Sequence, residues 1–120
     1  IVISKDKSFA VTLIASRRQE SDLSQIVVWR IADAFTLHRI RPPFFETIQP
    51  EFTIFALSPN DELIASGDNF GGIRIWNVKT GEEVVSFDVN ALPLDLSFTA
   101  DGSGLIIVLG DGTVRLWGVP

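Results

Sequence analysis

The sequence predicts an all-β fold of repeated, four-stranded antiparallel units, and three observations lead to this expectation. Residues 58–76 and 99–117 each end in a tryptophan and align at an offset of 41 residues without a gap. Apolar runs of four to six residues alternate with Gly, Pro, Asn and Asp, which is typical of short strands joined by tight turns. The run 105–109 is apolar at every position, which predicts a strand that is buried on both faces.

A stack of sheets explains these observations together. The hairpin-length connections require antiparallel strands, whereas the unbroken apolar run requires cover on both sides of its sheet. Radially stacked blades meet both requirements, and a repeat of roughly 40 to 45 residues with a strand-terminal Trp is typical of a propeller blade. We therefore expect a partial β-propeller whose ring is incomplete. A β-sandwich is the alternative, and it does not explain the gapless repeat.

The first repeat is the least regular. Residues 1–4 read as part of a strand, and the repeat closes at Trp29, which is 47 residues before the next closing tryptophan. About seven extra residues fall in the connection between its second and third strands, around residues 17–24. We assign residues 1–41 to this degenerate blade with its long loop.

The second repeat is the clearest. Pro50, which cannot donate a backbone hydrogen bond, precedes its first strand, and Ser, Pro, Asn and Asp form a turn at 58–61. About six extra residues precede the repeat, so the blade that we assign to 42–88 begins with a loop insertion. Its four expected strands are 52–57, 63–66, 73–77 and 83–87.

The third repeat follows the second but is shorter. Its expected strands are 94–98, 105–109 and 113–117. The sequence reaches residue 120 before a fourth strand, so the blade assigned to 89–120 is expected to lack its outer strand. Because the sequence starts without Met and inside a strand, we expect it to be part of a longer protein.

Two segments carry a specific motif. Residues 65–67 read Ala-Ser-Gly and residues 73–77 read Ile-Arg-Ile-Trp-Asn, while residues 110–117 read Gly-Asp-Gly-Thr-Val-Arg-Leu-Trp. Both segments resemble the Trp-Asp (WD) repeat. The resemblance extends over about two and three-quarter repeats, and it implies blades of the WD-repeat type.

The resemblance also implies a hydrogen-bond network of Trp, Ser or Thr, Asp and His within a blade. The matching structural positions in this sequence are Trp29, Trp76, Trp117, Ser66 and Asp111. Phe70 stands where the second repeat should have its Asp, and Ile107 replaces the Ser of the third repeat. None of the three tryptophans is followed by Asp. We therefore expect degenerate blades that are held mainly by apolar packing.

Composition narrows the possible functions. With 15 acidic and 10 basic residues the formal net charge is −5, which disfavours nucleic-acid binding because phosphate neutralisation needs clustered Lys and Arg. No apolar run approaches the roughly 18 residues of a membrane-spanning helix. The absence of Cys and of a signal-like start agrees with a reducing compartment. We expect a cytoplasmic protein with no nucleic-acid or membrane partner.

The sequence offers no recognisable catalytic, cofactor or metal site. His38 is the single His, and one His without Cys cannot assemble a zinc site of the usual kind. We expect its side chain to face solvent on the outermost strand of the first blade. The glycine-rich segment 67–72 opens a strand, so it reads as a hairpin turn and not as a phosphate-binding loop. The chain is therefore expected to be no enzyme and to hold no cofactor or metal.

The two insertions predict a contact surface. In a propeller, the connections that carry them emerge on the same face, and insertions on one face often mark a binding face. Arg and aromatic side chains carry much of the energy of protein interfaces. We expect partner binding by Arg17, Arg18, Phe44 and Phe45. The alternative is that the Phe rings fold back between the blades and the Arg side chains are solvated.

The favoured function is a non-catalytic protein–protein interaction scaffold. The alternative is a sensor or targeting segment of a multidomain signalling enzyme, a kinase or an NTPase, whose catalytic domain lies outside this chain. The expected partners are other proteins or further blades of the same parent chain. An incomplete ring leaves apolar faces exposed at its two ends, so the isolated chain is also expected to self-associate.

Overall fold

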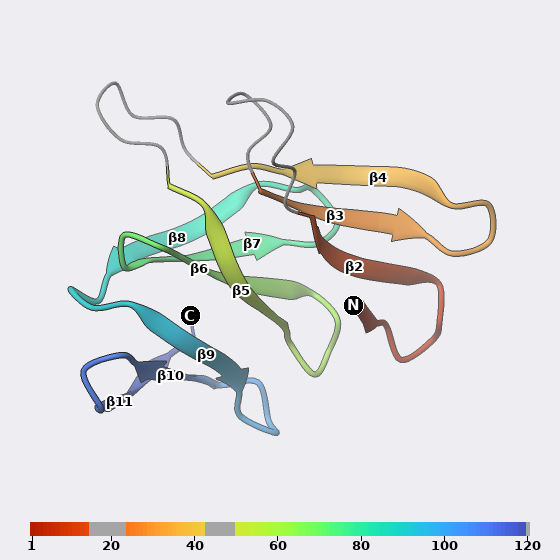
Figure 1. Ribbon diagram of the computed structural model, residues 1–120. Coiled ribbons are helices and arrows are strands. Elements are labelled where there is room, and N and C mark those ends of the chain that lie inside the picture. Colours follow the sequence, from red (N-terminus) through yellow and green to blue (C-terminus); the bar gives the residue numbers. More distant parts are fainter. Residues whose placement is uncertain (15–23, 43–49, 120) are drawn as a thin grey trace.

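The computed structural model describes residues 1–14, 24–42 and 50–119, and these residues form three antiparallel sheets that lie side by side (Figure 1). The first sheet contains β1 (Val2–Ile3), β2 (Phe9–Ile14), β3 (Gln25–Arg30) and β4 (Phe35–Ile40). The second contains β5 (Phe52–Leu57), β6 (Leu63–Asp68), β7 (Gly72–Asn77) and β8 (Glu83–Asp88). The third contains β9 (Pro93–Phe98), β10 (Gly104–Leu109) and β11 (Val114–Gly118).

Each strand pairs with its neighbours in the sequence, so every sheet is a simple meander. Two four-stranded sheets and one three-stranded sheet are the arrangement that the repeats predict, and the expected fold class of partial propeller blades is confirmed. The expected strands agree with the observed ones to within about two residues. The largest difference is in β6, which continues through Gly67 to Asp68.

The turn between the first two strands has the same construction in all three sheets. A hydroxyl oxygen at the first turn position accepts a hydrogen bond from the backbone amide five residues later, at 3.1, 2.9 and 3.0 Å. These pairs are Ser4 with Phe9, Ser58 with Leu63, and Thr99 with Gly104. Short polar side chains stabilise turns by bonding nearby backbone groups, so the repeated Ser/Thr fixes where each second strand begins.

Two apolar layers join the sheets. The layer between the first and second sheets contains Val11, Ile26, Val28, Ile64 and Trp76. The layer between the second and third sheets contains Ala65, Ile73, Ile75, Leu105 and Ile107. The second sheet thus contributes alternate residues to both layers, and its neighbours bury both of its faces.

The expectation for the run 105–109 is wrong in one respect. Leu105, Ile107 and Leu109 are buried against the second sheet, but Ile106 and Val108, which alternate with them, are only partly buried. The reason is that no sheet of the described residues packs on the other side of β10. The apolar run thus indicates a strand with two apolar faces, but the described residues bury only one face of β10.

Candidate functional site

One edge of the stack carries two adjoining grooves. We call this edge the turn rim. It contains the turns that join the first strand to the second, and the third to the fourth, in the sheets. The first groove has a volume of about 760 Å³ and lies between the first and second sheets. Its lining includes Phe9, Val28 and Val78 as apolar residues and His38 and Asp61 as polar ones.

The second groove lies between the second and third sheets and has a volume of about 560 Å³. Its lining is more polar and includes Asn77, Asp101 and Ser103. Asn60, Glu62 and Lys79 line both grooves. The two grooves therefore form a continuous hollowed surface that crosses all three sheets at the turn rim.

Two hydrogen bonds between sheets hold the first groove in shape. The backbone amide of Lys5 donates to the carboxylate of Asp61 at 2.8 Å. The ring nitrogen Nε2 of His38 lies 2.7 Å from the carbonyl oxygen of Lys79, to which it can donate. The expectation of a solvent-facing His38 is therefore wrong, because the ring is half-buried against the turn of the next sheet.

The carboxylates of the turn rim act as hydrogen-bond acceptors within their own turns. The backbone amide and hydroxyl of Ser103 and the hydroxyl of Thr99 all donate to Asp101, and this lowers the pKa of Asp101 to about 2. The Ser8 hydroxyl and amide likewise lower the pKa of Asp6. These groups are ionised at neutral pH, and they maintain the shape of the turns beside the grooves.

The described residues contain no group of three or more His, Cys, Asp or Glu side chains that could hold a metal ion. Within the same ranges, no helix is long and apolar enough to span a membrane. The imidazole of His38 is held by the backbone carbonyl of Lys79. The hollowed shape and mixed lining of the turn rim suit the binding of another molecule.

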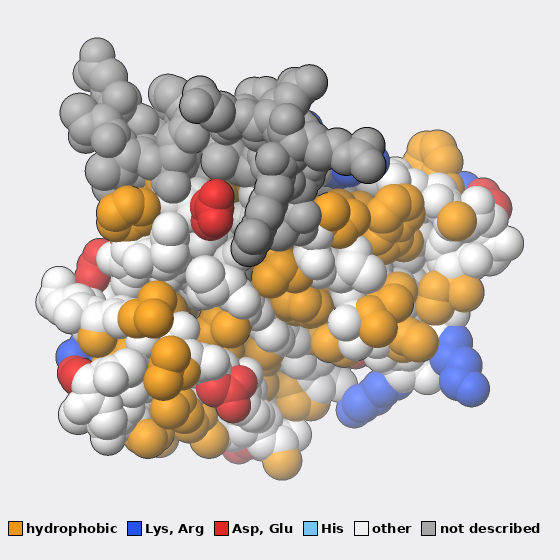
Figure 2. Space-filling model, in the orientation of Figure 1, with side chains coloured by type: hydrophobic (Ala, Val, Ile, Leu, Met, Phe, Trp, Pro, Cys, Tyr) orange, Lys and Arg blue, Asp and Glu red, His pale blue; other side chains and the backbone are white. Residues whose placement is uncertain are grey.

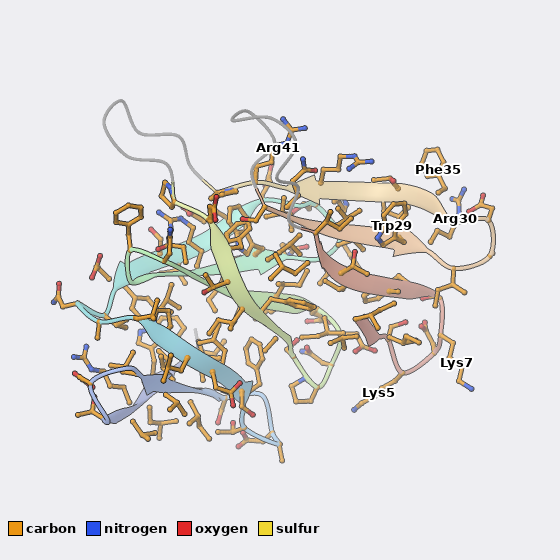
Figure 3. The ribbon with its side chains drawn as sticks, in the orientation of Figure 1. Lys5, Lys7, Trp29, Arg30, Phe35 and Arg41 are labelled. Atoms are coloured by element: carbon orange, nitrogen blue, oxygen red, sulfur yellow. The ribbon has the colours of Figure 1, made fainter. Side chains whose placement is uncertain are left out.

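Two of the three closing tryptophans bond to a hydroxyl on the neighbouring strand. The indole nitrogen of Trp76 donates to the Ser66 hydroxyl at 2.9 Å, and that of Trp29 donates to the Thr12 hydroxyl at 2.8 Å. Figure 3 shows Trp29 on the first sheet. The Thr12 pair was not predicted, because the loop insertion separates Thr12 from Trp29 by seven more residues than the equivalent pair in the second repeat.

Comparison with known proteins gives three informative relatives. The Pre-rRNA-processing protein IPI3 of Mycosarcoma maydis is 34% identical over 56% of this chain and 12% of its own length. Eukaryotic translation initiation factor 3 subunit I of Aspergillus oryzae is 42% identical over 43% of this chain and 16% of its own length. Periodic tryptophan protein 2 of Arabidopsis thaliana is 29% identical over 79% of this chain and 10% of its own length. No family model matches the chain.

All three relatives are WD-repeat proteins, and the last of them aligns with most of the chain. The chain is similar to WD-repeat proteins, as its sequence motifs predict. It spans between 10% and 16% of the length of these relatives.

The third WD repeat replaces the indole hydrogen bond with ring stacking. Trp117 stacks on Phe87 of the second sheet with ring centroids 4.8 Å apart and an interplanar angle of 29°. Ile107 lies at the position of the pairing hydroxyl and is buried in the apolar layer. Asp111 accepts hydrogen bonds from the amide and hydroxyl of Thr113 at 2.9 and 2.6 Å, so it stabilises its own turn.

A buried ion pair in the second WD repeat was not predicted. Asp68 accepts the backbone amides of Phe70 and Gly72 at 2.8 and 2.9 Å and lies 3.1 Å from a guanidinium nitrogen of Arg74. Arg74 Nε is also 3.1 Å from Glu83, although this contact is too poorly aligned to be a hydrogen bond. Asp68 thus stabilises the turn between β6 and β7. It lies two residues before Phe70, the position at which the WD pattern has its Asp.

The predicted partner-binding residues Arg17, Arg18, Phe44 and Phe45 lie outside the described residues. Their contribution to binding stays a prediction. The described ends that flank the two WD-repeat insertions do meet, because the Phe52 amide donates to the Ser24 hydroxyl at 2.6 Å.

Proposed function

We propose that this chain is a non-catalytic protein-interaction scaffold and that its turn rim binds an extended segment of a partner protein. The observation that carries the proposal is the pair of adjoining grooves, which share Asn60, Glu62 and Lys79 and run across three rigidly packed sheets. A rigid, preformed surface lowers the entropy that is lost on docking.

The chemistry of the grooves supports a peptide segment as the ligand. Apolar residues such as Phe9 and Val78 line the first groove, and they can bury a side chain of the partner. Polar groups of both charges surround them, including Lys79 and Glu62, and can pair with backbone and polar side chains. A nucleic acid needs a predominantly basic surface, which this mixed lining does not provide.

The relatives support a role in assemblies. The name of one of them describes a subunit of a translation initiation factor, and another is named for pre-rRNA processing. We propose a comparable scaffold role for the protein that contains this chain. A cytoplasmic location belongs to the same proposal, and the lack of Cys supports it.

Site-specific photo-crosslinking in the full-length protein tests the proposal. A photoreactive amino acid at Leu37 or Lys79 places the probe in the first groove. The control probe replaces Val84, which is exposed on β8 and lines neither groove. We expect a protein partner that crosslinks from both groove positions and not from the control position.

Binding measurements with the identified partner provide a second test of the proposal. Leu37→Lys places a charge beside the apolar lining, and we expect about tenfold weaker binding with an unchanged melting temperature. Val84→Lys should leave the affinity unchanged. If both variants bind the partner as well as the parent does, the turn rim is not the binding surface.

A further inference from the structure

The walls of the two grooves differ in charge along the turn rim. Among the described lining residues, those of the first sheet include one basic and one acidic side chain, Lys5 and Asp6. Those of the second and third sheets include one basic and three acidic side chains, which are Lys79, Asp61, Glu62 and Asp101. The formal charge of the lining is therefore zero on the first sheet and −2 on the other two sheets.

A second lysine makes the first-sheet end of the turn rim basic. Lys7 lies in the same turn as Lys5, between β1 and β2, and Figure 3 shows both side chains pointing outward. Among the described residues, neither lysine forms an ion pair. Figure 2 shows basic side chains at the lower right, beside the first sheet, and acidic side chains at the lower left, over the third sheet. A cationic group of a ligand is disfavoured beside the two lysines, because like charges repel.

The second groove offers carboxylate oxygens that can accept further hydrogen bonds. All three hydrogen bonds that Asp101 accepts from described residues end on Oδ1, and the one that Glu62 accepts through its side chain ends on Oε2. Among the same residues, no donor reaches Asp101 Oδ2 or Glu62 Oε1. Both side chains line the second groove and are exposed. These two oxygens suit a guanidinium or ammonium group, which donates several hydrogen bonds and carries the complementary charge.

The first groove offers an apolar surface next to these carboxylates. Val28 and Val78 are buried in its lining, and Leu37 is 40% exposed at its surface. An apolar side chain of a ligand can cover Leu37 and contact the partly buried ring of Phe9. Because Glu62 lines both grooves, the apolar surface and the free carboxylate oxygens belong to one continuous site.

We infer that the turn rim selects a segment of a partner protein in which an apolar side chain fills the first groove and an Arg or Lys side chain lies in the second groove, beside Glu62 and Asp101. This inference rests on the proposed function and adds the chemistry and the orientation of the bound segment. The lysines of the first-sheet turn oppose the reversed orientation, in which the basic residue would lie beside them. Charge complementarity of this kind mainly determines which partner is accepted and in which register it binds.

Peptides displayed on phage provide a probe that does not require the partner. A library of random short peptides is selected on the immobilised full-length protein, and peptides that also bind the Leu37→Lys variant are removed. The remaining peptides depend on the first groove, because Leu37 lines it. We expect these peptides to share an apolar residue and, a few positions away on one side, an Arg or Lys.

The affinity of a fluorescent consensus peptide then tests the charges directly. The double variant Glu62→Gln/Asp101→Asn removes both charges and retains oxygen acceptors of similar shape. We expect about tenfold weaker binding and a smaller dependence on salt concentration. Glu82→Gln is the matched control, because Glu82 is exposed in the turn after β7 and lines neither groove. Its affinity should stay within about twofold of the parent's, as for a distant exposed charge.

A substitution in the peptide separates loss of the contact from damage to the fold. Replacing the Arg or Lys of the peptide with Gln should weaken binding to the parent by the same factor and should leave binding to the double variant unchanged. A double variant that binds weakly because its turns are distorted would instead lose further affinity for the substituted peptide, and that result would overturn the inference.

The outcomes also distinguish this inference from the proposed function. If no selected peptide depends on Leu37, the turn rim does not bind peptide segments, and both the proposed function and this inference are wrong. Leu37-dependent peptides that lack a basic residue, or that carry an acidic residue in its place, would leave the proposed function intact and overturn the inference. Equal affinity of the consensus peptide for the parent and the double variant would do the same.

Discussion

The backbone amide of Phe52 donates a buried hydrogen bond to the hydroxyl of Ser24 at 2.6 Å, and this bond joins the second sheet to the first. The Phe52 ring packs edge-on against Trp76, with centroids 6.2 Å apart and an interplanar angle of 88°. Phe52 thus forms a hydrogen bond to the first sheet through its backbone and an aromatic contact within the second sheet through its side chain. Phe52 and Ser24 are both buried, so the serine hydroxyl supplies the hydrogen-bond acceptor that a buried amide at the start of β5 requires.

Replacing Ser24 with Ala should destabilise the chain by about 1–3 kcal/mol, because the Phe52 amide would remain buried without a partner. Urea unfolding followed by tryptophan fluorescence measures the effect. Ser97→Ala is the matched control, because Ser97 is exposed on β9 and its side chain makes only a long local contact. Equal unfolding free energies for the two variants would show that the Ser24 hydrogen bond contributes nothing.

Trp76→Ala should cost about 3–5 kcal/mol, as is usual for a large buried aromatic side chain. Trp29 has an equivalent hydrogen bond but is only partly buried, so Trp29→Ala should cost less. Measuring both variants by urea unfolding separates the effect of burial from that of the hydrogen bond, because both tryptophans make the hydrogen bond but only Trp76 is buried. Equal losses for the Trp29 and Trp76 variants would contradict the expectation that burial determines the difference between them.

The contact of His38 with Gly81 predicts a difference between two glycines of similar backbone conformation. Gly81 has φ +73° and Gly112 has φ +87°, so Ala at either position should cost about 1–2 kcal/mol of backbone strain. A Cβ at Gly81 would also lie 2.9 Å from His38 Nδ1, whereas a Cβ at Gly112 has no neighbour within 4 Å. Thermal unfolding should therefore show a larger loss for Gly81→Ala than for Gly112→Ala.

A double variant checks the cause of that difference. In a His38→Ala background the extra cost of Gly81→Ala should disappear, leaving a loss equal to that of Gly112→Ala. If the extra cost persists without the imidazole, the strain arises within the turn itself and the His38 contact is incidental.

The sequence was sufficient for the fold because the signals that define a blade are local. Trp76 and Ser66 lie within one repeat, and a gapless offset to the third repeat fixes their strands. Thr12 carries the same signal, but the inserted loop hides its spacing from Trp29. Asp68 was missed because it stabilises the turn from a position that the family pattern does not use.

The two grooves could not be predicted in the same way. The hydrogen bond of His38 to Lys79 spans 41 residues and depends on how two sheets dock, which no local pattern encodes. Function-bearing surfaces of a stacked fold arise between repeats, so they require the packed structure.

The turn carboxylate of Asp101 predicts a specific dependence of stability on acid. Hydrogen bonds from Ser103 and Thr99 lower its pKa in the folded state from 3.8 to about 2, so the folded state favours the ionised form. This stabilising contribution is fully present above pH about 4. It is lost as pH falls through about 2, because Asp101 is then protonated in both the folded and the unfolded chain. The second repeat supplies the matched variant: its Asn60 accepts the equivalent bonds from the Ser58 hydroxyl and the Glu62 amide. We therefore expect Asp101→Asn to preserve the turn at neutral pH and to lose less stability than the parent between pH 4 and pH 2, measured by urea unfolding. A carboxyl NMR titration of the parent should place the Asp101 midpoint near pH 2, and a midpoint close to 4 would contradict the assignment.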